Sequence, residues 1–179
     1  MSAEPVRCDW ATSDPLYIAY HDEEWGRPVR DEHGLYERLC LEGFQSGLAW
    51  ITILRKRDAF RAAFAGFDPE KVARFDEGDV ERLLADAGIV RHRGKIEATI
   101  ANAHGVLALR AAGTPLPELM WEHVDRPDGN ELSKRLKTAG FRFVGPTTAY
   151  AAMQACGIVD DHIPDCWVRE EIERARRAG

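Results

Sequence analysis

Two cysteines and two histidines near the ends of the chain have the chemistry of a metal site. Cys8 and His21 lie close to the N-terminus, and His162 and Cys166 lie four positions apart near the C-terminus. Two thiolates and two imidazoles suit tetrahedral zinc, and four protein ligands leave no open position for a catalytic water. The pattern favours a structural zinc that joins the chain ends. The spacing matches no compact zinc finger, so four unconnected side chains are the alternative.

Aromatic residues gather in sequence around one carboxylate. Glu42 interrupts an apolar run, and no lysine or arginine lies between residues 39 and 54. A buried acid needs a partner, and aromatic faces attract positive charge. Together they predict a receptor for a flat cation, whereas a solvated glutamate beside ordinary core aromatics is the alternative. The aromatic residues concerned are Trp10, Tyr17, Tyr20, Trp25 and Trp50.

Two further segments have the composition of phosphate contacts. The sequence Arg91-His92-Arg93-Gly94-Lys95 holds three basic residues and no acid where a helix is expected to begin, and a helix N-terminus suits an anion. Residues 140–148 place glycines between two expected helices, and free N–H groups in such a hairpin could hold a DNA phosphate. A solvated helix start and a plain connector are the respective alternatives.

Length and composition restrict the class of protein. The 179 residues fit a single domain, residues 1–179, and 24 basic against 30 acidic residues give a net charge of −6, so any DNA contact must be local. With 45% hydrophobic and 30% charged residues, collagen-like and disordered classes are excluded. No apolar stretch of signal-peptide or membrane-spanning length occurs. We expect a cytoplasmic protein without a membrane partner, whose cysteines are thiols or metal ligands.

The elements that position these residues are expected to be helices. Apolar residues recur at steps of three or four, as in Ile96, Ile100, Ala103 and Leu107, which predicts an all-α domain of eight or nine helices. Asp68-Pro69-Glu70 predicts a helix start, and glycines follow several periodic runs. The best strand candidate, 141–144, has only four residues, and 125–130 is expected to be a surface loop.

Several ordered segments resemble the 3-methyladenine DNA glycosylase I family of the helix-hairpin-helix superfamily. They include Asp14-Pro15-Leu16-Tyr17-Ile18-Ala19-Tyr20-His21, Leu41-Glu42-Gly43-Phe44-Gln45, Gly140-Phe141-Arg142-Phe143-Val144-Gly145 and Met153-Gln154-Ala155-Cys156-Gly157. The resemblance implies an all-α helix-hairpin-helix glycosylase fold. It also implies one structural zinc, held by the family's ligand positions at Cys8, His21, His162 and Cys166.

The same resemblance implies a function. Family members excise 3-methyladenine from alkylated double-stranded DNA by hydrolysing its N-glycosidic bond, which leaves free base and an abasic site. We expect a monomer that acts as a monofunctional glycosylase without lyase activity; the alternative is a zinc-stabilised module that binds lesions without turnover. Glu42 is the expected catalytic residue, and it binds the base together with Tyr17, Tyr20 and Trp50. The expected DNA contacts are Gly47, Leu48, Arg93, Lys95, Val144 and Gly145.

The sequence departs from the family pattern at two places. The loop between Trp121 and Ser133 is shorter than in other members, and Asp160 stands where many members carry asparagine. Related helix-hairpin-helix glycosylases place a catalytic aspartate in a similar Val-Asp-x-His string. Asp160 is therefore a candidate for a secondary catalytic role, stabilising an oxocarbenium-like sugar.

Overall fold

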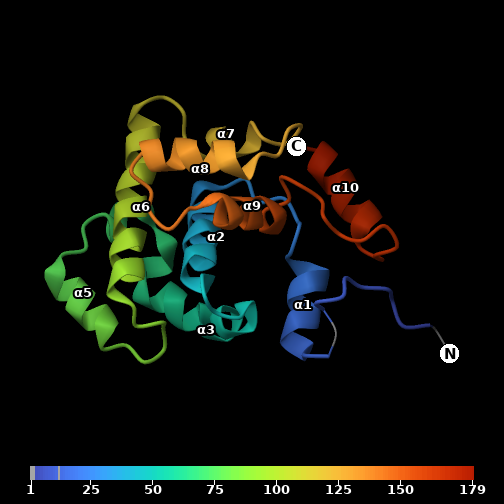
Figure 1. The fold of residues 1–179 in the computed structure, drawn as a ribbon, viewed down its shortest axis with the longest axis horizontal. Helices are drawn as coiled ribbons and strands as arrows, with labels where there is room; N and C mark the ends of the chain where they lie inside the picture. The colour runs from blue at the N-terminus through green and yellow to red at the C-terminus, as the bar shows by residue number, and fades with distance from the viewer. Residues whose placement is uncertain (1–2, 12) are drawn as a thin grey trace.

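The computed structural model describes residues 3–11 and 13–179, and these residues form helices and connecting loops without a strand (Figure 1). The all-α prediction is confirmed for this part of the chain. It holds ten α-helices and one 3₁₀ turn, which is more than the eight or nine helices expected. The elements are α1 (Pro15–Glu23), α2 (Glu32–Gln45), α3 (Trp50–Ala63), η1 (Ala65–Phe67), α4 (Pro69–Val72), α5 (Glu77–Leu84), α6 (Arg93–Ala111), α7 (Leu116–Trp121), α8 (Gly129–Thr138), α9 (Pro146–Ala155) and α10 (Arg169–Arg177).

Local capping explains where these helices begin. The predicted start of α4 is confirmed, since the Asp68 side chain accepts a hydrogen bond from the Glu70 N–H and Pro69 occupies the first turn. Asp128 caps α8 in the same way by accepting from the N–H groups of Asn130 and Glu131. The expected loop 125–130 is therefore shorter than predicted, because Gly129 already belongs to α8.

Helix α2 forms the centre of the main hydrophobic core. In Figure 1 it lies between α6 on one side and α9 on the other. Leu35, Tyr36 and Leu39 on this helix are fully buried. The Tyr36 hydroxyl donates to the carbonyl oxygen of Thr99 in α6 at 2.6 Å. Burial and this bond fix the helix that carries Glu42.

The connection between α8 and α9, residues 139–145, is a short loop, called the hairpin below. Asn102 of α6 holds it by both ends of its amide: Oδ1 accepts from the Arg142 N–H at 2.7 Å, and Nδ2 donates to the Arg142 carbonyl at 3.2 Å. Residues 141–144 form no strand, because a side chain rather than a neighbouring strand takes these backbone groups. Phe143 adopts a positive φ of 55° at the turn.

A second, smaller hydrophobic cluster joins the two ends of the chain. Its buried members are Cys8, Cys166, Val168 and Ile172. The N–H of Trp167 donates to the Val6 carbonyl at 3.0 Å. Figure 1 accordingly shows α1 and α10 on the same side of the main core.

Within the described residues, no helix is long and apolar enough to span a bilayer.

Gly157 and Gly113 each follow a helix, but only Gly157 packs against the segment after α1. Substitutions at these two glycines therefore test how firmly that segment is held in place. Gly157 (φ +77°) lies so close to this segment that an added Cβ would stand 2.5 Å from the Gly26 carbonyl oxygen. Gly113 (φ +85°) has the same kind of backbone but no atom within 4 Å of the Cβ position. We expect Gly113→Ala to lose about 1–2 kcal/mol of unfolding free energy from backbone strain alone. Gly157→Ala should lose about 1–3 kcal/mol more because the Cβ meets backbone.

Urea unfolding of both variants beside the wild type measures this difference. Equal losses would show that the segment after α1 moves away at little cost.

Candidate active site

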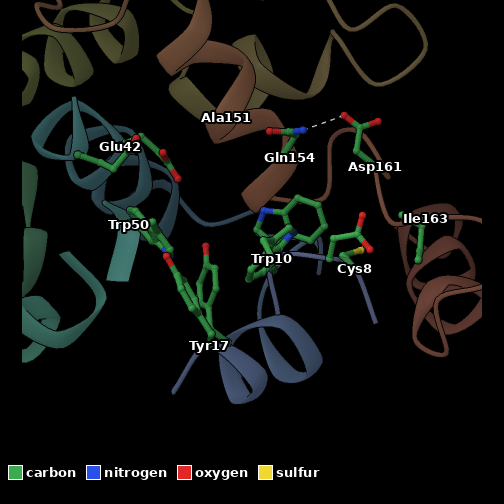
Figure 2. Close-up of a pocket in the computed structure, with 13 residues that line it drawn as sticks. Cys8, Trp10, Tyr17, Glu42, Trp50, Ala151, Gln154, Asp161 and Ile163 are labelled. Atoms are coloured by element: carbon green, nitrogen blue, oxygen red, sulfur yellow. Dashed lines mark hydrogen bonds between the residues drawn. The ribbon is translucent and has the colours of Figure 1, made fainter. Parts of the chain in front are cut away.

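A cavity of about 460 Å³ lies where the main core meets the cluster of the chain ends. Its walls come from the N-terminal segment, α1, α2, α3, α9 and the loop before α10, so segments distant in sequence enclose one space (Figure 2). The volume lies in the range of small-molecule sites in proteins. The lining residues are Cys8, Asp9, Trp10, Tyr17, Tyr20, Trp25, Glu42, Gln45, Trp50, Ala151, Gln154, Asp161 and Ile163.

Glu42 is the buried acid of this cavity. Its residue is only 8% exposed, and burial raises the pKa of its carboxyl to about 7. No lysine or arginine is among the described residues that line the cavity. The nearest arginines of α3 are engaged elsewhere, Arg57 with Glu24 and Arg61 with Glu37. The carboxyl is therefore free to interact with a ligand.

The aromatic residues expected around Glu42 all line the cavity. The Trp10 ring contacts Tyr17 edge-on, with centroids 5.7 Å apart, and it contacts Trp25 at 5.1 Å. Tyr20 meets Trp50 at 5.6 Å. Burial raises the pKa of the Tyr20 hydroxyl, which keeps that group neutral. The sequence pattern thus correctly grouped these side chains, and the structure adds that Trp10 binds the group together by touching three of them.

The polar groups of Tyr17 and Trp50 differ in whether the protein satisfies them. The Tyr17 hydroxyl accepts a hydrogen bond from the backbone N–H of Ile51 at 3.0 Å, which ties α1 to the first turn of α3. The indole Nε1 of Trp50 is buried without an acceptor in the protein. An unsatisfied buried donor is unfavourable, so this N–H is a group that a ligand can satisfy.

Gln154 and Asp161 are cavity residues that the sequence analysis did not select. The Nε2 of Gln154 and the hydroxyl of Tyr150 both donate to Asp161 Oδ2, at 2.9 Å and 2.6 Å. The one available signal was the spacing of Tyr150 and Gln154, four positions apart and so on one face of α9. Neither residue type alone indicates a site.

Three of the four predicted metal ligands lie together. The ligand atoms of Cys8, His21 and Cys166 are all within 4.8 Å of one another, and all three residues are buried. Nδ1 of His21 lies 2.8 Å from Asp22 Oδ1, so Nε2 is directed to the cysteines, with Cys166 Sγ 3.5 Å away. Histidines that bind a metal through one ring nitrogen commonly donate a hydrogen bond from the other ring nitrogen to a carboxylate, as His21 can to Asp22.

His162 lies beside this group and not fully in it. Its ring centroid is 4.9 Å from that of His21, and both of its ring nitrogens are buried without a hydrogen-bond partner. Asp160 accepts a hydrogen bond from the His162 backbone N–H at 3.1 Å, and its side chain is buried. Asp160 does not line the cavity, so the structure does not support its expected secondary role in catalysis. Its neighbour Asp161 reaches the cavity instead.

The turn after α2 carries Gly47 and Leu48 on the surface. Gly47 has φ +78° with open space around it, and Leu48 is 38% exposed, which is unusual for a leucine. Lys95 supports this turn from α6: its Nζ donates to the carbonyls of Phe44 at 2.9 Å and Ser46 at 2.7 Å. Lys95 is 8% exposed, so the expected phosphate contact by its side chain is wrong; the ammonium instead satisfies carbonyls freed at the end of α2.

The other expected DNA contacts, Arg93, Val144 and Gly145, differ in the groups that they could present to DNA. Arg93 is exposed but forms ion pairs with Glu77 and Glu81 of α5, so its charge is already balanced. The Val144 side chain is fully buried, and Gly145 caps α9. Among the described residues, neither Val144 nor Gly145 donates its backbone N–H to a protein acceptor. Val144 is buried as a whole residue, so the expected DNA contact has no exposed atom there, whereas the half-buried Gly145 keeps a backbone N–H without an acceptor in the described part of the chain.

The site is thus an aromatic cavity that holds one buried carboxyl and has no lysine or arginine among its described lining residues, and known proteins resemble the chain that forms it. The methyladenine glycosylase family matches residues 10–170. The chain is 49% identical over 177 residues to DNA-3-methyladenine glycosylase 1 of Escherichia coli, which covers 89% of this chain and 95% of that protein. A crystal structure of a 3-methyladenine DNA glycosylase I matches with a TM-score of 0.87 and 49% identity, over 90% of this chain and 98% of the other.

A further solved structure is a single-residue variant of a 3-methyladenine DNA glycosylase I in complex with 3-methyladenine. It matches with a TM-score of 0.86 and 37% identity, over 91% of this chain and 97% of the other. The chain therefore belongs to the methyladenine glycosylase family and is an enzyme of that kind.

The burial of Glu42 predicts a dependence of stability on pH. Its pKa in the folded protein, about 7, lies above the ordinary 4.5, so ionisation opposes folding as the pH rises through 7. Wild-type protein should lose about 2–3 kcal/mol of unfolding free energy between pH 5 and pH 8 relative to Glu42→Gln, which cannot ionise at this position. Urea unfolding of both proteins at the two pH values measures the difference. A constant difference would mean that the carboxyl is paired or solvated.

Proposed function

We propose that the protein excises 3-methyladenine from alkylated double-stranded DNA. The observation that carries this proposal is a buried carboxyl, Glu42, in an aromatic cavity without a lining cation. Methylation at N3 gives the purine in DNA a positive charge, which aromatic faces and a carboxylate both attract. A relative bound to 3-methyladenine supports the same ligand.

The reaction is hydrolysis of the bond between the base and the sugar. The bond from C1′ of the sugar to N9 of the base breaks, and its electron pair neutralises the cationic ring. Water forms the new bond to C1′ and releases a proton to solvent, which leaves an abasic site. Because the methylated base is already a good leaving group, the protein needs to supply less acid catalysis than for a normal base. Glu42, Trp50 and the tyrosines act by holding the cationic base.

Glu42 is expected to ionise when the base enters. A cation beside a carboxyl favours its charged form, so binding lowers the pKa that burial had raised to about 7. The ionised carboxylate then accepts a hydrogen bond from one N–H of the exocyclic amine of adenine. A neutral, unmethylated adenine offers no charge to compensate the burial of the carboxylate, so the cavity favours the damaged base.

Access to the base requires that it leave the helix. Extrusion costs a few kcal/mol, less for a damaged base, and stacking on aromatic side chains returns about 1–3 kcal/mol per contact. Leu48 is exposed at the tip of a turn held by Lys95, so it is placed to enter the gap that the base leaves. The N–H of the half-buried Gly145, at the start of α9, has no acceptor among the described residues and suits a DNA phosphate.

We also propose that the enzyme is monofunctional. A lyase step needs an amine that reaches C1′, and no lysine is among the described residues that line the cavity. Lys95, the buried lysine near the site, donates to two carbonyls. The remaining parts of the proposal are the expectations from the sequence that the protein is a monomer of one domain and acts in the cytoplasm.

Release of free base from methylated duplex DNA tests the activity, with the base identified by chromatography. The wild type should release 3-methyladenine, and Glu42→Gln should lose at least about 100-fold in single-turnover rate because it removes the charge that holds the cation. Glu37→Gln is the control, since Glu37 is also a buried acid of α2 but pairs with Arg61 outside the cavity. The product strand should stay uncut without alkali.

Binding of the methylated DNA by both proteins without release of base would instead favour the alternative, a lesion-binding module. Equal rates for Glu42→Gln and the wild type would remove Glu42 from catalysis.

A zinc ion held by Cys8, His21, Cys166 and His162 is the second part of the proposal. Three ligand atoms already lie within 4.8 Å of one another, and the unsatisfied buried ring nitrogens of His162 beside them fit a fourth ligand. Four protein ligands make the ion structural, and it would join the N-terminal aromatic segment to the loop before α10.

Metal analysis of purified protein should give about one equivalent of zinc, and Cys8→Ser and His162→Ala should each lower both the zinc content and the melting temperature. Cys156→Ala is the control, because Cys156 is a fully buried thiol outside the cluster and its variant should keep the metal. Purified wild-type protein without zinc, or His162→Ala with full and tightly bound zinc, would contradict this ligand set.

A further inference from the structure

The strongest unassigned feature is a fixed amide at the wall of the cavity. Gln154 lies on α9 and lines the cavity together with Glu42 and Asp161. Figure 2 shows its nitrogen directed to Asp161 and its oxygen on the opposite side, toward Glu42. The amide thus has one end engaged by the protein and the other facing the space for the base.

The chemistry of Asp161 determines which end of the amide faces the cavity. An ionised carboxylate only accepts hydrogen bonds, so the amide must offer it the Nε2 donor. Asp161 is itself held by the Tyr150 hydroxyl, which donates to the same oxygen at 2.6 Å, while Gln154 donates at 2.9 Å. The hydrogen bond to Asp161 also raises the pKa of the Tyr150 hydroxyl to about 12, so Tyr150 remains a donor at neutral pH.

Gln154 therefore presents a carbonyl oxygen, an acceptor, to the cavity. Adenine carries an amine with two N–H donors at position 6, where guanine carries a carbonyl oxygen that only accepts. An acceptor with fixed orientation attracts the amine and repels the carbonyl. Glu42 takes one N–H of the amine in the proposed function, which leaves the second without a partner.

We propose that Gln154 is a specificity-determining residue that accepts the second N–H of the adenine amine, and that Asp161 and Tyr150 are positioning residues that fix its amide. The inference rests on the proposed function of the same cavity and deepens it: the fixed acceptor makes the enzyme select 3-methyladenine over 3-methylguanine. A free amide would turn its Nε2 to the carbonyl of guanine and lose this selection.

Equilibrium binding of the two free bases, 3-methyladenine and 3-methylguanine, tests the inference through tryptophan fluorescence. Gln154→Leu should lower the ratio of the two affinities about three- to ten-fold, as expected for one hydrogen bond. Asp161→Ala should lower this ratio by less than Gln154→Leu does. Without Asp161 the Gln154 amide can rotate, but its oxygen still faces the cavity for part of the time. Asp161→Asn keeps an oxygen that accepts from both neighbours and should retain most of the selectivity.

The double variant Gln154→Leu/Asp161→Ala separates positioning from a general structural role. If Asp161 acts only through the amide, the double variant should have the selectivity of Gln154→Leu alone. Additive losses, or an unchanged ratio in Gln154→Leu, would overturn the inference. An Asp161→Asn variant that loses as much selectivity as Asp161→Ala would overturn the positioning role.

Base release from methylated DNA by the same proteins distinguishes this inference from the proposed function. Wild-type protein that prefers 3-methyladenine in binding but releases no base would contradict the proposed excision and support the inference. Wild-type protein that binds the two bases equally, or binds neither, would overturn the inference even if base is released.

Discussion

The structure depends on one unfavourable burial, that of the Glu42 carboxyl without a cation. Desolvation raises the pKa of this carboxyl to about 7. Near neutral pH the carboxyl is therefore partly protonated and partly ionised. Three cations of neighbouring helices have other partners: Arg57 pairs with Glu24, Arg61 pairs with Glu37, and Lys95 binds two carbonyls. If one of these three side chains entered the cavity, it would pair with the Glu42 carboxylate, which could then no longer bind a ligand. The folded protein thus leaves the Glu42 carboxylate without a cationic partner, and in the proposed function the methylated base is that partner.

Such a cavity needs walls that do not collapse on the carboxyl, and the chain supplies them from both of its ends. The N-terminal segment brings Trp10, and the loop before α10 brings Asp161. Neither segment belongs to the main core, so both depend on the small cluster around Cys8 and Cys166. The possible metal group of Cys8, His21 and Cys166 therefore lies next to the cavity, and Cys8 both belongs to this group and lines the cavity.

Much of this site could be predicted from sequence because its residue types are rare in combination. An acid inside an apolar run and five aromatic residues led to the correct cavity wall, and helix periodicity led to the all-α fold. The errors came from residues with more than one common role. The basic turn that contains Lys95 predicts a phosphate contact. Only the fold shows that the Lys95 side chain is directed inward and donates to a carbonyl at the end of α2. Asp160 and Asp161 are adjacent, and only the path of the loop decides which of them faces the cavity. Gln154 gave only the weak signal of its spacing from Tyr150, because its role depends on Asp161, a partner that lies beyond its own helix.

The base receptor and the surface proposed to meet DNA are coupled because both are attached to the same end of α2. Lys95 fixes the turn that carries Leu48 to the last residues of this helix. On the other side, the hairpin approaches α2 at Gly43, next to Glu42, where an added Cβ would stand 3.1 Å from the Phe143 carbonyl oxygen. Phe143 keeps a positive φ there, a conformation that costs energy for a residue with a side chain. A larger residue at position 43 would push the hairpin away from the helix that carries the acid. The close approach therefore fixes the distance between the hairpin and the Glu42 carboxyl, and so between the proposed phosphate contact at Gly145 and the proposed base contact.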